Sequence, residues 1–279
     1  MSSIDDPVEH YDRVTRAWQY VLGEDFHFGY FRHESESLDT ATRNLTTLMA
    51  ERGSFEPGMS VLDVGCGIGN PACLLADQYE CRVTGISTSP AGVEHAQLRA
   101  KERGYSERVS FMVADGMNNG LPAGSFDRIW VLESSHLMPR KEALLAECAR
   151  VLRRGGRLAL CDLMSKRNVP LGEMLSRAKD YIHLNYAFGR AKMETLGTYR
   201  QFAALAGLRV VDSIDISEQT FPTFAQWRQR VETNREQVRE LIGDDGLEHF
   251  RASCYFLPEL WERQILGYGL MVAVKEEGR

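Results

Sequence analysis

The sequence of 279 residues predicts an α/β fold, with a doubly wound seven-stranded sheet, mostly parallel with an antiparallel edge strand, and a helical cap. Two patterns indicate this fold. Short apolar runs alternate with helix-patterned stretches between residues 58 and 165, as they do in consecutive βαβ units. A glycine-rich turn follows the first apolar run and opens a helical stretch, which is typical of the ligand-binding edge of a parallel sheet.

Composition and charge restrict the possible functions. With 43% hydrophobic and 26% charged residues, the chain has an ordinary globular composition. A formal charge of -6 argues against nucleic acid as a partner. The six cysteines lack paired metal-ligand spacing, so we expect no metal and no disulfide. The N-terminus has no signal-peptide pattern and no apolar run is long enough to span a bilayer, which predicts a cytoplasmic protein without a membrane partner.

Each element of the central region follows from its pattern. Helix-patterned stretches carry apolar residues three or four apart, and Pro90 suits the first turn of one of them. Strands are expected at 60–64, 82–86, 109–113, 126–131 and 157–161, with helices at 71–79, 90–103 and 140–152.

After residue 165 the pattern changes. A helix is expected over 173–184, then an aromatic loop with Tyr186 and Phe188, then a second helix over 195–206. The stretches 208–217 and 268–274 are expected to be strands that pair at the sheet edge, with a helical insertion between them. We therefore predict three parts, namely N-terminal helices and a lid (1–57), a cofactor-binding core (58–165) and a substrate cap that includes the last two strands (166–279).

The segment VLDVGCGIGNPACLLA, which begins at Val61, is the most informative motif. A strand that ends in a glycine-rich turn before a helix lets backbone N–H groups approach a ligand. A dinucleotide fingerprint requires its third glycine at position 70, but this chain has Asn70 there and its third glycine is Gly69. The pattern D-x-G-x-G-x-G gives a wider loop, which suits a ligand that carries a carboxylate and an amine.

The segment VLDVGCGIGNP resembles motif I of the class I S-adenosylmethionine-dependent methyltransferases. Later motifs of the family are similar, in the right order, to VTGIS (83–87), ADGMNNGLP (114–122), SFDRIWVLESSHLMP (125–139) and LRRGGRLALCD (152–162). Upstream, the pair Tyr11-Asp12 and FHFGYF (26–31) are similar to the small-molecule subgroup, which includes tocopherol, sarcosine and natural-product methyltransferases. The resemblance implies a Rossmann-like core, S-adenosylmethionine as cofactor and methyl transfer to a small-molecule acceptor.

The resemblance also implies a set of site residues. The expected cofactor-binding residues are Tyr11, Asp63, Gly65, Cys66, Gly67, Gly69, Asn70, Ile86, Ser87, Asp115, Gly116 and Met117. Glu133 and His136 follow the fourth strand at the ligand-binding edge, and they are the candidates to hold the acceptor or to take its proton. Three positions depart from the family, and one of them is Arg140, which takes the place of an aspartate after Pro139. Ser87 stands where the wider class has an acidic residue, and His136 lies one residue before the usual histidine position, which is Leu137 here.

Aromatic residues are concentrated outside the central core, so the cap is expected to enclose the acceptor. We predict a small aromatic or lipophilic natural product, methylated at oxygen, nitrogen or carbon by in-line displacement in a monomer or homodimer. Two other functions fit the same residues. A non-methylating, cyclase-like enzyme would keep the bound cofactor and leave the product mass unchanged. A Rossmann oxidoreductase is the second alternative, and it would bind nicotinamide.

Overall fold

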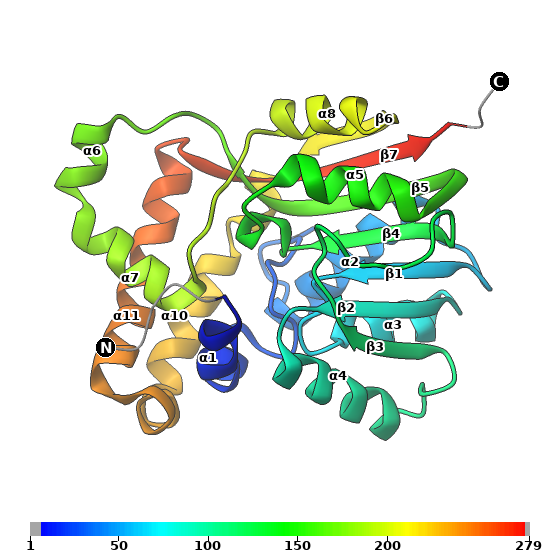
Figure 1. Cartoon of the computed structure of the whole chain (residues 1–279). Helices are drawn as coiled ribbons and strands as arrows, with labels where there is room; N and C mark the ends of the chain where they lie inside the picture. The colour runs from blue at the N-terminus through cyan, green and yellow to red at the C-terminus, as the bar shows by residue number, and fades with distance from the viewer. Residues whose placement is uncertain (1–6, 277–279) are drawn as a thin grey trace.

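This computed structural model describes the backbone of residues 7–276 and the side chains of residues 14–276. The strands are β1 (Ser60–Val64), β2 (Arg82–Ser87), β3 (Val109–Val113), β4 (Phe126–Leu132), β5 (Leu152–Ser165), β6 (Leu208–Asp215) and β7 (Leu266–Lys275). They form one sheet in the order β3-β2-β1-β4-β5-β7-β6 (Figure 1). Strand β7 runs antiparallel to both of its neighbours, β5 and β6, while β1 to β5 are parallel. The predicted fold class is therefore confirmed.

Helices cover both faces of this sheet and extend beyond one end of it. They are α1 (Pro7–Leu22), α2 (Leu38–Gly53), α3 (Asn70–Gln78), α4 (Pro90–Glu102), the 3₁₀ turn η1 (Ser135–Leu137), α5 (Lys141–Val151), α6 (Leu171–Ser176), α7 (Ala178–Phe188), α8 (Leu196–Leu205), α9 (Ser217–Thr220), α10 (Thr223–Thr233) and α11 (Arg235–Glu262). Helices α2, α3 and α4 pack on one face, and α5 and α8 pack on the other. Helices α6, α7, α10 and α11 gather on the left of Figure 1 beside α1, and we call these five helices the cap.

The central strands β1 and β4 carry apolar residues at consecutive positions because both faces of the sheet are covered. Along β1, Val61 joins the apolar cluster on one face and Leu62 joins the cluster on the other. Trp130 and Val131 alternate in the same way along β4. Side chains of successive strand residues point to opposite faces, so burial on both faces favours apolar residues at consecutive positions. This is the pattern from which the five central strands were predicted.

The prediction that the last two strands pair is confirmed, because β6 and β7 are neighbours with Leu208 opposite Lys275. Strand β5 extends beyond its predicted range of 157–161. It pairs with β7 as far as Ser165, and this long partner explains the extension. The helical insertion between β6 and β7 consists of α9, α10 and α11, and α11 bends at Gly243, whose φ is 76°.

The structure corrects the predicted helix over 173–184 and the aromatic loop after it. Two helices, α6 and α7, meet at Arg177, whose φ of -117° and ψ of 21° leave the helical region. Helix α6 buries no side chain, so its apolar periodicity does not mark a core face. Tyr186 and Phe188 lie in α7, which continues to Gly189, where φ reaches 81°. The helix therefore ends at the glycine and not before the aromatic residues.

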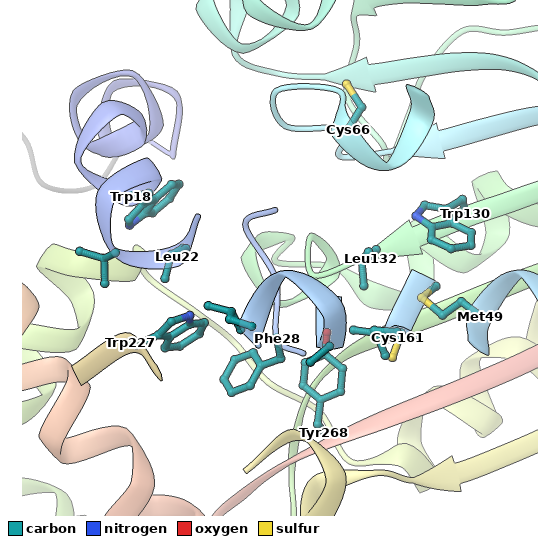
Figure 2. Packing of buried hydrophobic residues seen from close by; sticks show 14 of the residues in the cluster. Trp18, Leu22, Phe28, Met49, Cys66, Trp130, Leu132, Cys161, Trp227 and Tyr268 are labelled. Atoms are coloured by element: carbon teal, nitrogen blue, oxygen red, sulfur yellow. The ribbon is translucent and has the colours of Figure 1, made fainter. Parts of the chain in front are cut away.

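A lid, residues 23–36, joins α1 to α2 and is anchored in the cap by Phe28. Its ring centroid lies 4.6 Å from that of Trp227, 5.4 Å from that of Trp261 and 5.2 Å from that of Tyr268. Figure 2 shows Trp18, Phe28, Trp227 and Tyr268 gathered in this region. Aromatic contacts of this kind contribute about 0.5–1.5 kcal/mol each beyond burial, so the lid is held firmly. Helix α2, by contrast, packs on the sheet against β5 and β7. Within the predicted N-terminal part, the described residues 7–57 thus contribute to both cap and core.

Within the described residues, no helix is long and apolar enough to cross a membrane. The six cysteines are all buried and none forms a disulfide.

Candidate active site

The loop between β1 and α3 depends on its glycines. Their φ angles are 81° at Gly65, 53° at Gly67 and 80° at the third glycine, all in the left-handed region that favours glycine. A Cβ atom at Gly65 would lie 2.2 Å from the Cβ atom of Ser134, so a larger residue is also excluded by space. The backbone N–H groups of Gly65 and Cys66 donate to the carbonyl oxygen of Ile86 at 2.8 and 3.0 Å. These bonds hold the loop against the end of β2.

Asp63 precedes this loop and has an unsatisfied carboxylate. Its side chain is buried, and no described residue forms a hydrogen bond with Oδ2. Burial raises the pKa of Asp63 to about 7. A buried acceptor without a partner is costly, and an ammonium group on a ligand would relieve that cost. The backbone N–H groups at the N-terminus of the helix that follows the loop are suited to a carboxylate, so the residues present fit a cofactor with an amino-acid moiety.

A cavity of about 650 Å³ opens beside the glycine loop. Its walls come from the lid, the loop, the end of β4 and helices α7, α10 and α11. Six predicted site residues line it, namely Gly65, Cys66, Gly67, Asn70, Glu133 and His136. The structure therefore brings the predicted catalytic candidates to the same cavity as the glycine loop.

Other predicted cofactor residues do not line this cavity. They are Asp63, Gly69, Ile86, Ser87, Asp115, Gly116 and Met117. The Oγ atom of Ser87 accepts a hydrogen bond from the Ser89 N–H at 3.2 Å, and Oδ1 of Asp115 accepts one from the Met117 N–H at 2.8 Å. Both bonds stabilise local turns at the ends of β2 and β3. Tyr11 belongs to α1, but its side chain lies outside the described residues. The roles of these residues stay predictions.

The Asn70 side chain connects the lid to helix α4. Its Oδ1 accepts hydrogen bonds from Nη1 of Arg99 at 3.0 Å and from Nη1 of Arg103 at 2.7 Å, and its Nδ2 donates to Asp25 of the lid. Both ends of the amide are therefore engaged. The residue that replaces the third glycine of a dinucleotide fingerprint thus positions the lid above the loop.

Glu133 connects β4, β7 and the lid. Its Oε1 accepts a hydrogen bond from the Phe28 N–H at 2.5 Å and another from the Tyr268 hydroxyl. Its backbone is strained, with a φ of 44° at a residue that is not glycine. Part of Glu133 faces the cavity, yet desolvation of its carboxyl group outweighs the two hydrogen bonds and raises its pKa to about 8, with a further contribution from the Asp162 charge.

This raised pKa predicts a pH-dependent stability. Between the ordinary value of 4.5 and about 8, the folded protein keeps the Glu133 proton that the unfolded chain has lost. The contribution of Glu133 to the free energy of unfolding should therefore fall as the pH rises through this window and level off above it. In urea denaturation of the cofactor-free protein, Glu133→Gln should gain stability relative to wild type from pH 5 to pH 8. The other ionisable groups are the same in both proteins, so their effects cancel in the comparison, and parallel stability curves would contradict the prediction.

His136 is held by a buried carboxylate. Its Nδ1 lies 2.7 Å from Oδ1 of Asp162, and its backbone N–H donates to Oδ2 at 3.0 Å. The Leu163 N–H donates to Oδ1 at 2.7 Å. Burial alone would raise the pKa of Asp162, but the charge and hydrogen bond of His136 and the bonds from Ser135 and Leu163 bring it below its usual value. An ionised carboxylate only accepts, so Nδ1 carries a hydrogen, and in the neutral form of the imidazole Nε2 is the nitrogen with a lone pair.

Sequence reasoning missed Asp162, although it is the last residue of the segment LRRGGRLALCD. A signal was present, because β5 is the next strand beyond β4 and ligands bind at the carboxyl ends of parallel strands. His136 lies one residue before the family's usual histidine position. Its side chain nevertheless lines the cavity and contacts Asp162.

The sequence is similar to those of known methyltransferases. A family profile described as "Methyltransferase domain" matches residues 62–160. The chain is 35% identical over 271 residues to the 27-O-demethylrifamycin SV methyltransferase of Amycolatopsis mediterranei (strain S699), with 96% of each chain covered. It is 34% identical over 218 residues to methyltransferase GfsG of Streptomyces halstedii, with 77% of each covered.

Solved structures extend the similarity to the whole fold. The [4+2]-cyclase SpnF superimposes with a TM-score of 0.82 at 27% identity, over 99% of this chain and 100% of that one. The mycolic acid cyclopropane synthase CmaA1, solved with S-adenosylhomocysteine, has a TM-score of 0.85 at 18% identity over 96% of each chain, which shows the shared fold alone. Because a methyltransferase aligns over nearly the whole chain and the glycine loop fits an amino-acid-bearing cofactor, this protein belongs to the class I S-adenosylmethionine-dependent methyltransferases.

Proposed function

We propose that the protein methylates a hydroxyl oxygen of a lipophilic natural product, with His136 as the base. The observation that carries this proposal is that His136 lines the cavity beside the glycine loop while the buried Asp162 holds its Nδ1. A neutral hydroxyl must lose its proton on methylation, whereas a free amine attacks without help from a base. A histidine on the cavity wall that a buried carboxylate holds is therefore of most use to an oxygen nucleophile. Similar proteins include O-methyltransferases of fungi, such as resE of Aspergillus sclerotiorum at 30% identity.

The mechanism requires few groups from the chain. When bound, S-adenosylmethionine supplies a methyl group on a positively charged sulfur. The acceptor hydroxyl gives its proton to Nε2 of His136, and Asp162 stabilises the resulting imidazolium through Nδ1. A positioned base of this kind typically adds about 10²- to 10⁴-fold to the rate. Alignment of the reacting groups in the cavity can supply roughly 7–11 kcal/mol.

The cavity walls support an apolar acceptor. Phe26, Phe28, Leu132, Phe188 and Trp227 contribute aromatic and aliphatic surface to it. Aromatic walls of this kind bury most of a small ligand, and a few polar groups fix its orientation. Among the polar groups on this cavity, His136 and Glu133 are the two that follow β4. A monomeric or homodimeric state and a cytoplasmic location stay predictions.

The proposal is tested with an acceptor panel and S-adenosylmethionine that carries a labelled methyl group. Each phenol or alcohol of the panel is matched by the amine of the same carbon skeleton, and product mass and S-adenosylhomocysteine are measured together. We expect at least one hydroxyl acceptor to gain one labelled methyl group, with turnover above that of its matched amine. Transfer to amines alone would overturn the proposal.

A cyclase-like function is the second candidate, since the fold and 27% of the residues are shared with the cyclase SpnF. In that case the substrate would be isomerised, its mass would stay unchanged and no S-adenosylhomocysteine would form. The same assay distinguishes the two. Membership of the methyltransferase family removes the oxidoreductase alternative.

A further inference from the structure

We propose that Ser135 and Tyr199 are positioning residues for the base, and that they act on His136 through Asp162. The inference rests on the proposed function, in which His136 takes the acceptor's proton. Tyr199 belongs to α8, on the face of the sheet that α5 also covers. Its hydroxyl lies 2.7 Å from Oγ of Ser135, and Oγ of Ser135 lies 2.5 Å from Oδ2 of Asp162.

The direction of this chain of hydrogen bonds is fixed by Asp162. An ionised carboxylate has no hydrogen to give, so the Ser135 hydroxyl must donate to it. The one hydrogen of that hydroxyl is then used, and its oxygen accepts from Tyr199. Burial raises the pKa of Tyr199, which keeps its hydroxyl a neutral donor. The order of donation is therefore Tyr199 to Ser135 to Asp162, and His136 donates to the same carboxylate from the other side.

None of these groups can contact the acceptor. Ser135, Asp162 and Tyr199 are each 0% exposed, and none lines the cavity. The Tyr199 ring packs in an apolar cluster with residues such as Leu158 and Leu160. A phenylalanine would fill this space equally well and would leave no hydroxyl to desolvate. The hydroxyl is thus explained by its hydrogen bond and not by packing.

The four donors to Asp162 orient its carboxylate. Oδ1 accepts from Nδ1 of His136 and from the Leu163 N–H, and Oδ2 accepts from the Ser135 hydroxyl and the His136 N–H. Without the Ser135 hydroxyl, Oδ2 keeps a single donor and the carboxylate can rotate. The Nδ1–H tautomer of His136 is then less strongly favoured over the Nε2–H tautomer, and Nε2 is less often free to accept a proton.

Kinetics of Tyr199→Phe, Ser135→Ala and the double variant test whether the two residues act in series. Ser135→Ala should lower kcat about tenfold, and Tyr199→Phe by a smaller factor, with little change in the KM for S-adenosylmethionine. In the Ser135→Ala background, Tyr199→Phe should have no further effect. Tyr105→Phe and Ser253→Ala remove comparable hydrogen bonds, to Asp77 and to the His249 carbonyl, and should leave kcat unchanged. If the loss of kcat in the double variant is instead the product of the two single losses, the two residues act independently and do not act in series.

A readout without an acceptor separates this inference from the proposed function. Nitrogen NMR of ¹⁵N-histidine protein, saturated with S-adenosylhomocysteine and assigned with His136→Gln, reports the tautomer of His136. We expect the Nδ1–H form in wild type and a measurable share of the Nε2–H form in Ser135→Ala and Tyr199→Phe. An unchanged tautomer in both variants overturns the inference whichever acceptor is used. A changed tautomer in an enzyme that methylates only amines supports the inference and overturns the hydroxyl chemistry.

Discussion

His136→Ala is expected to lower kcat by about 10²-fold or more, while the affinity for S-adenosylmethionine changes little. The imidazole is the group on the cavity wall that a buried carboxylate holds as a proton acceptor, with Nδ1 2.7 Å from Asp162. Its removal leaves the cofactor loop intact, because no hydrogen bond connects the His136 side chain to residues 65–70 among the described residues. Steady-state kinetics and calorimetric titration measure the two quantities separately.

Asp162→Asn provides a companion to this experiment. The amide has the same shape, but it can present a donor to Nδ1 and so reverse the tautomer of His136, an effect that costs about 10⁴-fold in the Ser-His-Asp hydrolases. His95→Ala, on the exposed side of α4, is the matched control and should behave as wild type. If kcat falls less than about threefold in both His136→Ala and Asp162→Asn while the fold stays intact, positioning alone drives the reaction and no base is required.

Most of the fold was predictable because it depends on local patterns. The consecutive apolar residues Val61 and Leu62 of β1 and those at 129–132 of β4 reflect burial on both sides, and this signal needs no knowledge of distant residues. The break between α6 and α7 was not predictable in this way. It occurs at Arg177, which forms ion pairs with Asp180 and with Glu259 of the distant α11. The ion pair with Glu259 is a tertiary interaction at the end of α6. A short stretch of sequence around Arg177 does not include Glu259, so it cannot predict this helix end.

Some residues of the candidate site could likewise be predicted from local sequence, and others could not. Glu133 and His136 were predicted because the end of β4 lies at the ligand-binding edge whatever the rest of the chain does. Their partners depend on the topology. The Tyr268 hydroxyl reaches Glu133 from β7, 135 residues later in the chain, and only the strand order brings these two residues together. The lid position of Asp25, which explains Asn70, is equally invisible in the sequence.

Gly67→Val is expected to abolish measurable binding of S-adenosylmethionine. The residue combines a φ of 53° with a place on the cavity wall, in the loop whose backbone must approach the ligand. A branched side chain strains this backbone and occupies space that the ligand requires. Strain alone is measured by Gly104→Val, at a φ of 76° with no atom within 4 Å of the added Cβ.

We expect both variants to lose some thermal stability, because β-branched residues rarely adopt a positive φ. Only Gly67→Val should lose the calorimetric signal for the cofactor. If Gly67→Val binds S-adenosylmethionine as Gly104→Val does, the cofactor does not approach this loop, and the cavity beside it must bind the acceptor without the cofactor's methionine end. Such a result would also separate His136 from the methyl group, because His136 and the glycine loop share the walls of one cavity.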